Sequence, residues 1–230
     1  MRGSEVEMTF ALADADVEQV FAAFGSAGDA GFRVRRRPAR SVLHFYLEPT
    51  GPRATTRLRV RRRRSVLRTS LETKQVVHEE TWRVHKTERT CVDHMPPAQA
   101  AALLCDADPV VSAFIKDQHR MALESPAGTL KASLDRILPF RADRPETTGP
   151  PFWHVEVEET GAWPLADFLG SAFVRHELTA LRPLLRSKWE AARLGPPCAV
   201  PDAARDDIGA YFSALLDRGE RALRPQWRAA

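Results

Sequence analysis

The chain has 230 residues, of which 43% are hydrophobic and 28% are charged, and this balance excludes a disordered protein. Its 34 Lys and Arg against 30 Asp and Glu give a net charge of +4, which indicates an anionic partner only weakly. The cysteines, Cys91, Cys105 and Cys198, lack the spacing of a zinc site and predict reduced thiols. No apolar run suits a signal peptide or a transmembrane helix, so we expect a cytoplasmic protein without a membrane segment.

The first part of the chain predicts short strands in series. Residues 5–12 alternate between polar and apolar side chains, and a helix is predicted at 14–24. Further alternating runs follow at residues 32–37, 41–47, 55–63, 68–77 and 80–92. Strands that follow one another without crossover helices predict an antiparallel sheet.

The second part of the chain adds three strands and several helices. Pro96-Pro97 opens a helix predicted to end near residue 106, and strands are expected at 113–124, 129–138 and 152–159. Helices are predicted at residues 165–185, 187–194 and 203–223. We therefore predict an α+β fold, a closed antiparallel eight-stranded β-barrel with flanking and C-terminal helices. Residues 1–195 would form the barrel domain, and residues 196–230 a helical extension that packs on it.

One face of several predicted strands is charged, although the interior of a barrel is ordinarily apolar. Arg57 and Arg59 share one face of their strand, opposite Leu58 and Val60. The same alternation places together Glu72 and Lys74; Lys116, Gln118 and Arg120; Lys131, Ser133 and Asp135; and His154, Glu156 and Glu158. A solvated sheet face would explain any one of these strands, but a closed barrel must turn one face inward. If helices cover the apolar outside, the charges line a lumen that holds water, metal and an ionic ligand.

A lumen of mixed charge suits a chain of phosphates. Arg and Lys bind phosphate oxygens through charge-assisted hydrogen bonds. Carboxylates would repel the chain unless a divalent cation lies between them, and Mg²⁺ prefers oxygen ligands and bridges carboxylates to phosphates. Two carboxylates at positions i and i+2 of a strand point the same way and can share one ion. The residues thus indicate metal-assisted phosphoryl chemistry.

Two Glu-x-Glu pairs stand at opposite ends of the β region, Glu5-Val6-Glu7 and Glu156-Val157-Glu158. The other charged motifs follow in the order Arg57-Leu58-Arg59, Glu72-Thr73-Lys74, Arg120, Asp135 and, beyond the last strand, Lys188. Over residues 5–190 this order resembles the CYTH superfamily of triphosphate tunnel metalloenzymes. Its members include thiamine triphosphatases, inorganic tripolyphosphatases, class IV adenylate cyclases and metal-dependent RNA 5′-triphosphatases.

The resemblance implies a hydrolase that uses Mg²⁺ or Mn²⁺ to remove the terminal phosphate of a linear triphosphate or polyphosphate. The substrate would be inorganic tripolyphosphate, thiamine triphosphate or a nucleoside triphosphate, and nucleic acid is expected only as a 5′-triphosphate RNA end. The chain would be a monomer or a homodimer. The implied metal ligands are Glu5, Glu7, Glu72, Asp135, Glu156 and Glu158. The implied phosphate ligands are Arg57, Arg59, Lys74, Arg120 and Lys188, and the implied catalytic residues are Glu5, Glu7, Glu158 and Lys188.

The sequence departs from the family pattern at two places. Thr9 stands where the first motif, Glu-x-Glu-x-Lys, usually has Lys, and residues 43–48 keep only Phe45 and Tyr46 of a YFDT-like segment. Because Thr9 removes this cation, three consequences are possible. The enzyme could have a lower turnover or act on another substrate, or the protein could bind polyphosphate without hydrolysing it. The segments 187–189 and 130–135 resemble the VTC polyphosphate polymerases of the same fold, so a polymerase is a further alternative.

Overall fold

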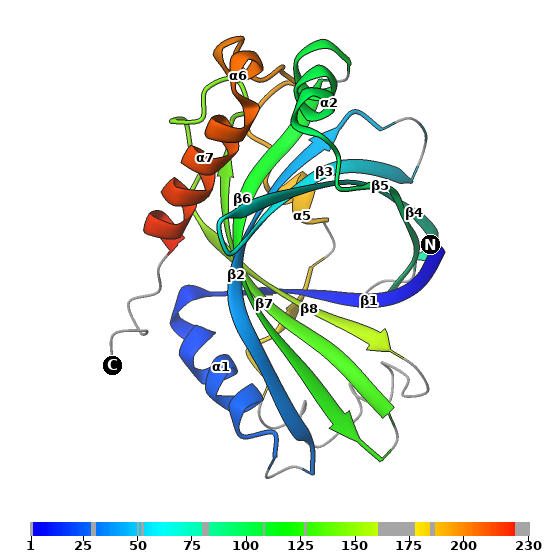
Figure 1. Ribbon diagram of the computed structural model, residues 1–230. Helices are drawn as coiled ribbons and strands as arrows, with labels where there is room; N and C mark the ends of the chain where they lie inside the picture. The colour runs from blue at the N-terminus through cyan, green and yellow to red at the C-terminus, as the bar shows by residue number, and fades with distance from the viewer. Residues whose placement is uncertain are drawn as a thin grey trace.

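The structure is a computed structural model that describes residues 2–28, 31–49, 51, 53–79, 83–107, 109–126, 128–160, 178–184 and 187–223 (Figure 1). At residues 2–5, 78, 79, 83–89, 107, 160 and 183 we describe the backbone alone. None of the described helices is both long enough and apolar enough to cross a bilayer.

Eight long strands form one antiparallel sheet. They are β1 (Arg2–Leu12), β2 (Arg33–Leu47), β3 (Ala54–Arg63), β4 (Val66–Glu79), β5 (Arg83–Asp93), β6 (Val110–Ser125), β7 (Gly128–Phe140) and β8 (Phe152–Thr160). Their order is β5-β4-β3-β2-β6-β7-β8-β1, followed by the two-residue β9 (Arg182–Pro183). β1 also pairs with β5 over residues 2–8, and the sheet curves round an interior (Figure 1). The predicted α+β fold with an eight-stranded antiparallel sheet is confirmed.

β2 is one continuous strand, where the sequence predicted two. Its register against β6 shifts between Arg37, which lies opposite Arg120, and Arg40, which lies opposite Gln118. Three steps along β2 thus correspond to two along β6, as in a β-bulge, and bulges tolerate a residue such as Pro38 that has no N–H to donate. The extra residue reverses the alternation of side chains, so Arg37 and Arg40 can face the same side of the sheet.

The helices are short, except at the C-terminal end of the described chain. They are the 3₁₀ turn η1 (Asp14–Asp16), α1 (Val17–Gly25), α2 (Pro97–Ala102), the π turn η2 (Leu103–Ala107), α5 (Lys188–Ala191), α6 (Ala203–Asp206) and α7 (Ile208–Leu223). The helix predicted at 203–223 is interrupted at Asp207, whose backbone is not helical.

The helix predicted at 165–185 falls largely outside the described residues. Its end is wrong, because residues 178–184 form a turn and β9 instead of a helix. Arg182 and Pro183 pair with Ala11 and Phe10 of β1. Proline cannot donate a hydrogen bond within a helix but is tolerated on an edge strand, which explains the difference.

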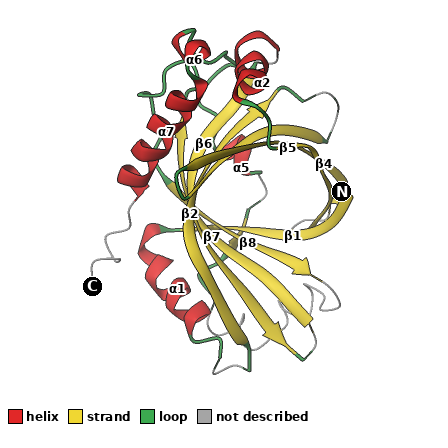
Figure 2. Ribbon diagram, in the orientation of Figure 1, coloured by secondary structure: helices red, strands yellow, loops and turns green. Residues whose placement is uncertain are grey.

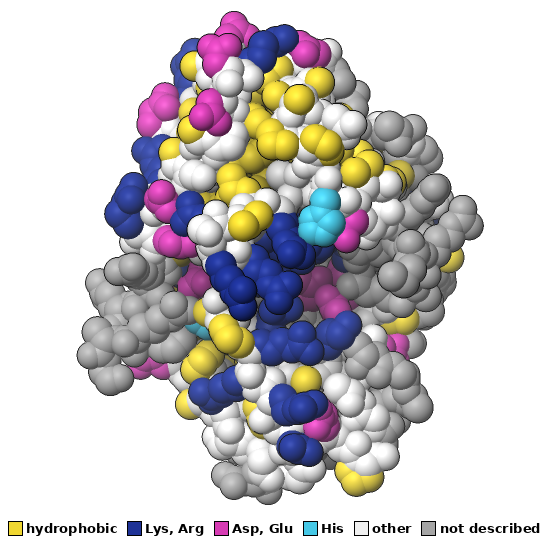
Figure 3. All heavy atoms as spheres, in the orientation of Figure 1, with side chains coloured by type: hydrophobic (Ala, Val, Ile, Leu, Met, Phe, Trp, Pro, Cys, Tyr) yellow, Lys and Arg dark blue, Asp and Glu magenta, His cyan; other side chains and the backbone are white. Residues whose placement is uncertain are grey.

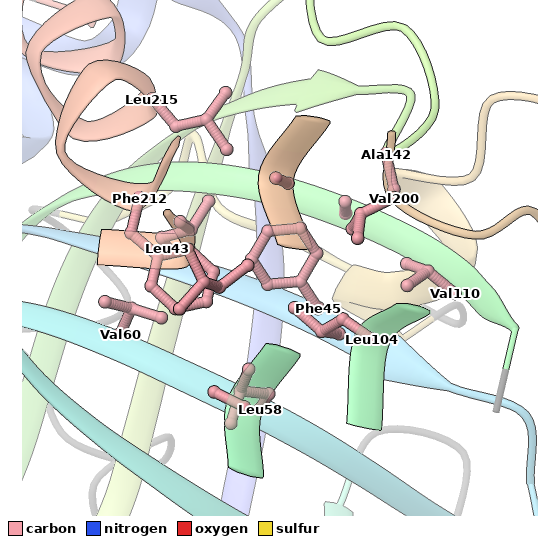
Figure 4. Close-up of a cluster of buried hydrophobic side chains, with 14 of the residues drawn as sticks. Leu43, Phe45, Leu58, Val60, Leu104, Val110, Ala142, Val200, Phe212 and Leu215 are labelled. Carbon is pink, nitrogen blue, oxygen red and sulfur yellow. The ribbon is translucent and has the colours of Figure 1, made fainter. Parts of the chain in front are cut away.

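The apolar faces of the strands point outward, and helices cover them (Figure 2). α1 packs on β1, β6, β7 and β8 through residues such as Val20 and Phe24, which are fully buried. α7 and α2 pack on β2, β3 and β6, where Leu58, Val60, Phe212 and Leu215 belong to one buried cluster (Figure 4). Because the outer faces hold the hydrophobic cores, the charged faces predicted from the sequence are left to the interior.

A third apolar cluster lies on the inner side of the sheet, at one end of the charged face. Tyr46, Phe114 and Ile137 gather there against Trp189 of α5, and the rings of Tyr46 and Trp189 stack with centroids 6.4 Å apart. α5 lies within the curve of the sheet (Figure 1). This end of the interior is therefore filled by side chains.

The close contact between α7 and β6 gives a prediction. A Cβ added at Gly219 would lie 2.4 Å from Cγ2 and 3.0 Å from Cβ of Ile115, a fully buried branched side chain. We expect Gly219→Ala to lower the free energy of unfolding by about 1–3 kcal/mol in urea titrations, although Ala favours helices.

Gly209→Ala is the matched control, since it lies in the same helix and its added Cβ would meet only the Asp207 side chain, at 3.3 Å. Equal stability of the two variants would contradict the packing described for α7.

Candidate active site

The inner face of the sheet encloses a cavity of about 380 Å³. Its charged lining residues are Arg37, Arg40, Arg57, Arg59, Lys74, Lys116, Arg120, Lys131, Lys188, Glu156 and Glu158. Figure 3 shows Lys and Arg side chains gathered round a hollow in this face, with acidic side chains beside them. Among the described residues that line it, nine cations stand against two carboxylates, which makes the cavity a site for an anion.

The two signs of charge come mainly from different strands. β2, β3 and β6 contribute arginines and lysines, whereas Glu7, Asp135, Glu156 and Glu158 come from β1, β7 and β8. Glu7 lies opposite Glu158 in the β1–β8 ladder, so these carboxylates are neighbours on one face. The cavity therefore has a basic wall and an acidic wall.

Glu72 joins the two arginines of β3 on the basic wall. Nε and Nη2 of Arg57 donate to one carboxylate oxygen of Glu72 at 2.9 and 2.7 Å, and Arg59 forms an ion pair with the other oxygen. Ser70 donates to Glu72 at 3.2 Å. Glu72 is only 1% exposed, so it holds both guanidinium groups in place at the edge of the cavity.

Asp135 and Glu156 bind two lysines on the acidic wall. Nζ of Lys116 lies 2.7 Å and Nζ of Lys188 3.3 Å from Oδ2 of Asp135, and Lys188 also forms an ion pair with Glu156. Burial alone would raise the carboxyl pKa values, but the two ammonium groups hold the pKa of Asp135 below and that of Glu156 well below the usual range. Burial lowers the pKa of Lys116 to about 8 despite Asp135.

His154 lies beside these carboxylates. Ligand atoms of Asp135, His154 and Glu156 lie within 4.8 Å of one another, and all three residues are buried. Both ring nitrogens of His154 and Oδ1 of Asp135 have no hydrogen-bond partner among the described residues. Burial, and then the charge of Lys188, lowers the pKa of His154 to about 3, so the imidazole is neutral and each buried group can act as a metal ligand.

Two further predicted carboxylates, Glu7 and Glu158, each lie near a lysine. Oε2 of Glu7 lies 3.7 Å from Nζ of Lys74, and Oε2 of Glu158 lies 3.6 Å from Nζ of the exposed Lys131. The side chain of Glu5 lies outside the described residues, although its backbone pairs with Lys86. The structure thus gathers ten of the eleven predicted site residues, with Glu5 undescribed.

Thr9 cannot serve as the missing lysine of the first motif. Its hydroxyl donates to the carbonyl oxygen of Leu184 at 3.3 Å, and the amide of Leu184 donates to the carbonyl of Thr9 at 2.9 Å. Thr9 lies opposite Glu156 in the ladder, and it is Lys188 that supplies a cation to Glu156. Thr9 therefore ties β1 to the segment before α5.

The sequence did not identify four cations of the site. Alternation puts Lys116 and Lys131 on charged faces but assigns them no role, and it assigns Arg37 and Arg40 to no face. Three residues apart, Arg37 and Arg40 would point to opposite sides of a regular strand. Pro38 between them was the available signal of a bulge.

Comparison with known sequences finds no matching family model and no matching curated protein. Solved structures do match. HpAC1 from Hippeastrum, described as an adenylyl cyclase candidate with a dominant triphosphatase activity, is 14% identical with a TM-score of 0.52, over 84% of this chain and 98% of its own.

Two proteins from Pyrococcus horikoshii OT3 are also similar to this chain in structure. PH1012 is 12% identical, with a TM-score of 0.52 over 83% of this chain and 99% of its own. PH1819 is 17% identical, with a TM-score of 0.51 over 81% of this chain and 97% of its own. The chain therefore has the fold of the CYTH-type triphosphate tunnel proteins, as the order of its charged motifs predicted.

Proposed function

We propose that this protein hydrolyses the terminal phosphate of a linear triphosphate or polyphosphate with the help of a divalent metal ion. The eight strands would form a closed tunnel, which the pairing of β1 with both β8 and β5 supports. The observation that carries the proposal is the cavity itself, with a basic wall facing an acidic wall. The Hippeastrum protein of the same fold is described as a triphosphatase, which agrees with it.

The acidic wall fits Mg²⁺ or Mn²⁺. It presents carboxylate oxygens, which hard divalent cations prefer, from adjacent strands on one face. Glu7, Glu156 and Glu158 would hold the ion together with Glu5. Oδ1 of Asp135, which has no hydrogen-bond partner among the described residues, would join them beside Glu156. Glu72 would act on the metal side only indirectly, through Arg57 and Arg59.

The basic residues would bind and orient the phosphate chain. Arg57, Arg59, Lys74 and Arg120 would donate to phosphate oxygens, with Lys188 reaching from α5 toward the terminal phosphate. The oxygen of a water molecule attacks the terminal phosphorus and the water loses a proton to solvent. The bridging P–O bond breaks with its electron pair on the oxygen of the shortened chain, and orthophosphate and the shortened chain leave. The cations stabilise the charge that develops on the leaving oxygen. A bound divalent ion would supply a water of lowered pKa and offset the carboxylate charge.

The direct test is a phosphate-release panel with Mg²⁺ and Mn²⁺ over tripolyphosphate, thiamine triphosphate, ATP and long polyphosphate. Release that requires the metal supports the proposal. If the protein instead lengthens polyphosphate from ATP and releases no phosphate, the result would favour the alternative of a VTC-like polyphosphate polymerase.

Thr9 favours a second candidate, a protein that binds polyphosphate without hydrolysing it. Its hydroxyl is engaged by Leu184, so the position supplies no cation beside Glu156. Tight binding of tripolyphosphate by the wild type in the presence of Mn²⁺, without release of phosphate, would support this candidate.

Glu158→Gln tests the proposed metal ligands. Since the amide keeps the shape but loses the charge, we expect phosphate release to fall by about two orders of magnitude, as for other groups that stabilise a transition state electrostatically. Glu159→Gln is the control, because Glu159 is the next residue along β8 and points to the opposite face. Equal release by both variants would contradict the assignment.

Asp135→Asn tests the buried ion pairs. The amide would leave Lys116 and Lys188 without their shared carboxylate, so we expect the free energy of unfolding in urea to fall by about 3–5 kcal/mol. Asp143→Asn is the control, since its pair with Arg141 is more exposed and should contribute little to stability. A loss at Asp135 no larger than at Asp143 would show that the lysines do not depend on this carboxylate.

Thr9→Lys tests the departure from the family motif. We expect it to raise metal-dependent phosphate release above that of the wild type, because it adds a cation beside Glu156. Thr9→Val separates this effect from loss of the bond to Leu184. Release by Thr9→Lys that does not exceed that of Thr9→Val would mean that the added charge has no role.

A further inference from the structure

The cavity becomes more exposed with distance from α5. Lys188 of α5 and Lys116 of β6 have side chains that are 12% and 8% exposed. Along β6 the exposure rises from Lys116 to the half-buried Arg120, and Arg37, opposite Arg120 on β2, is exposed. The apolar cluster around Trp189 fills the α5 end, so solvent reaches the cavity from the end where Arg37 lies.

Arg40 is oriented by an amide instead of a carboxylate. Nε and Nη2 of Arg40 both donate to the side-chain oxygen of Gln118, at 2.9 and 2.8 Å. Arg57 makes the same two-pronged contact to the carboxylate of Glu72. Gln118 therefore fixes the direction of the Arg40 guanidinium without neutralising its charge.

The neighbouring arginines repel one another. Burial, followed by the charges of Arg120, Arg61 and Arg59, lowers the pKa of Arg40 to about 10, and burial, Arg37 and Arg61 lower that of Arg120. Among the described residues, no carboxylate lies within ion-pair distance of Arg37, Arg40, Arg61 or Arg120. A cluster of like charges without an ion-paired carboxylate is costly unless an anion binds to it.

The bulge in β2 makes this cluster possible. Arg37 lies opposite Arg120, and the same row of the sheet continues through Ser133 to Glu156. Adjacent strands lie ~4.8 Å apart, so Arg120 and Glu156 are separated by about 10 Å of sheet. An anion bound at Arg37 and Arg40 beside Arg120 would thus continue across the sheet from one whose end lies at the acidic wall.

We propose that Arg37 and Arg40 extend the anion site beyond Arg120 as a second subsite at the exposed end of the cavity, which makes linear inorganic polyphosphate longer than three phosphates the preferred substrate. This inference rests on the proposed function, because it extends the chain held at the same site. Gln118 is a positioning residue of the subsite. The further phosphates of the chain lie against the arginines while its terminal phosphate lies near Lys188.

An RNA 5′ end suits this cavity less well. Bases need aromatic faces to stack on, and His44 is the one aromatic ring among the described residues that line the cavity. That ring is buried and already stacks on Phe114, with centroids 4.9 Å apart, and on Tyr46. A plain chain of phosphates needs only the cations.

The experiment measures binding with the metal removed by EDTA, so that no turnover occurs. Dissociation constants are measured for tripolyphosphate and for a long-chain polyphosphate. The constant for tripolyphosphate divided by that for the long chain reports the preference for long chains. We expect the ratio to fall by about tenfold in Arg40→Gln, Arg37→Gln and Gln118→Glu, as for loss of one charge-assisted contact. Gln118→Glu is isosteric and gives Arg40 a carboxylate partner, and Arg37 is exposed, so its variant cannot act by unfolding the core.

Arg144→Gln is the control for general charge, since Arg144 is 73% exposed and does not line the cavity. A ratio that is the same in wild type and in all three subsite variants would overturn the subsite, whether or not tripolyphosphate is hydrolysed. Tighter binding of single-stranded RNA than of polyphosphate of equal charge would also overturn it. An Arg40-dependent preference for long chains without any phosphate release would keep the subsite and reject the proposed hydrolase.

Discussion

Ion pairs between neighbouring strands, and between the strands and the distant α5, position the charged groups in the interior of this protein. Asp135 of β7 binds Lys116 of β6 and Lys188 of α5, and Lys188 also binds Glu156 of β8. Glu72 of β4 in the same way orients Arg57 and Arg59 of β3. Buried charges of this kind stabilise a fold little in total, but removing one partner is costly. The pairs therefore fix where the cationic groups stand more than they add to stability.

The interior of the sheet can be charged because the hydrophobic core lies on the outer side of the sheet. α1 and α7 cover the outward faces of the strands, where Phe24, Phe45 and Phe212 are buried. Each strand can then carry an apolar face for stability and a charged face for binding. The short α5 completes the arrangement, because Trp189 fills one end of the interior and Lys188 brings a cation to the acidic wall. One end is left for a ligand.

Much of this arrangement could be predicted from the sequence, because alternation along a strand assigns each side chain to a face. Arg57 and Arg59 opposite Leu58 and Val60 gave both the strand and its charged side, and the order of the motifs gave the fold. Alternation fails where the backbone is irregular. The bulge around Pro38 changes the face of Arg40, and the β-pairing of Arg182 and Pro183 depends on β1, which lies far away in the sequence.

Contacts between side chains could not be predicted either. Nothing in the spacing shows that Lys188 reaches Asp135 and Glu156, or that Gln118 holds Arg40, because these contacts depend on how strands from different parts of the chain curve together. The carboxylates grouped as metal ligands from the sequence therefore differ in the structure. Asp135, Glu156 and Glu72 are buried against their cationic partners, whereas Glu158 is partly exposed and so is its partner Lys131.

The central claim is that opposite charges meet round one ligand inside the sheet. Anomalous diffraction from crystals grown with Mn²⁺ and tripolyphosphate tests it most directly. We predict a manganese peak between Glu7, Glu156 and Glu158, with phosphate density extending from it along Arg57, Arg59 and Arg120. Manganese and phosphate found only on the outer surface, with the interior holding neither, would contradict the account.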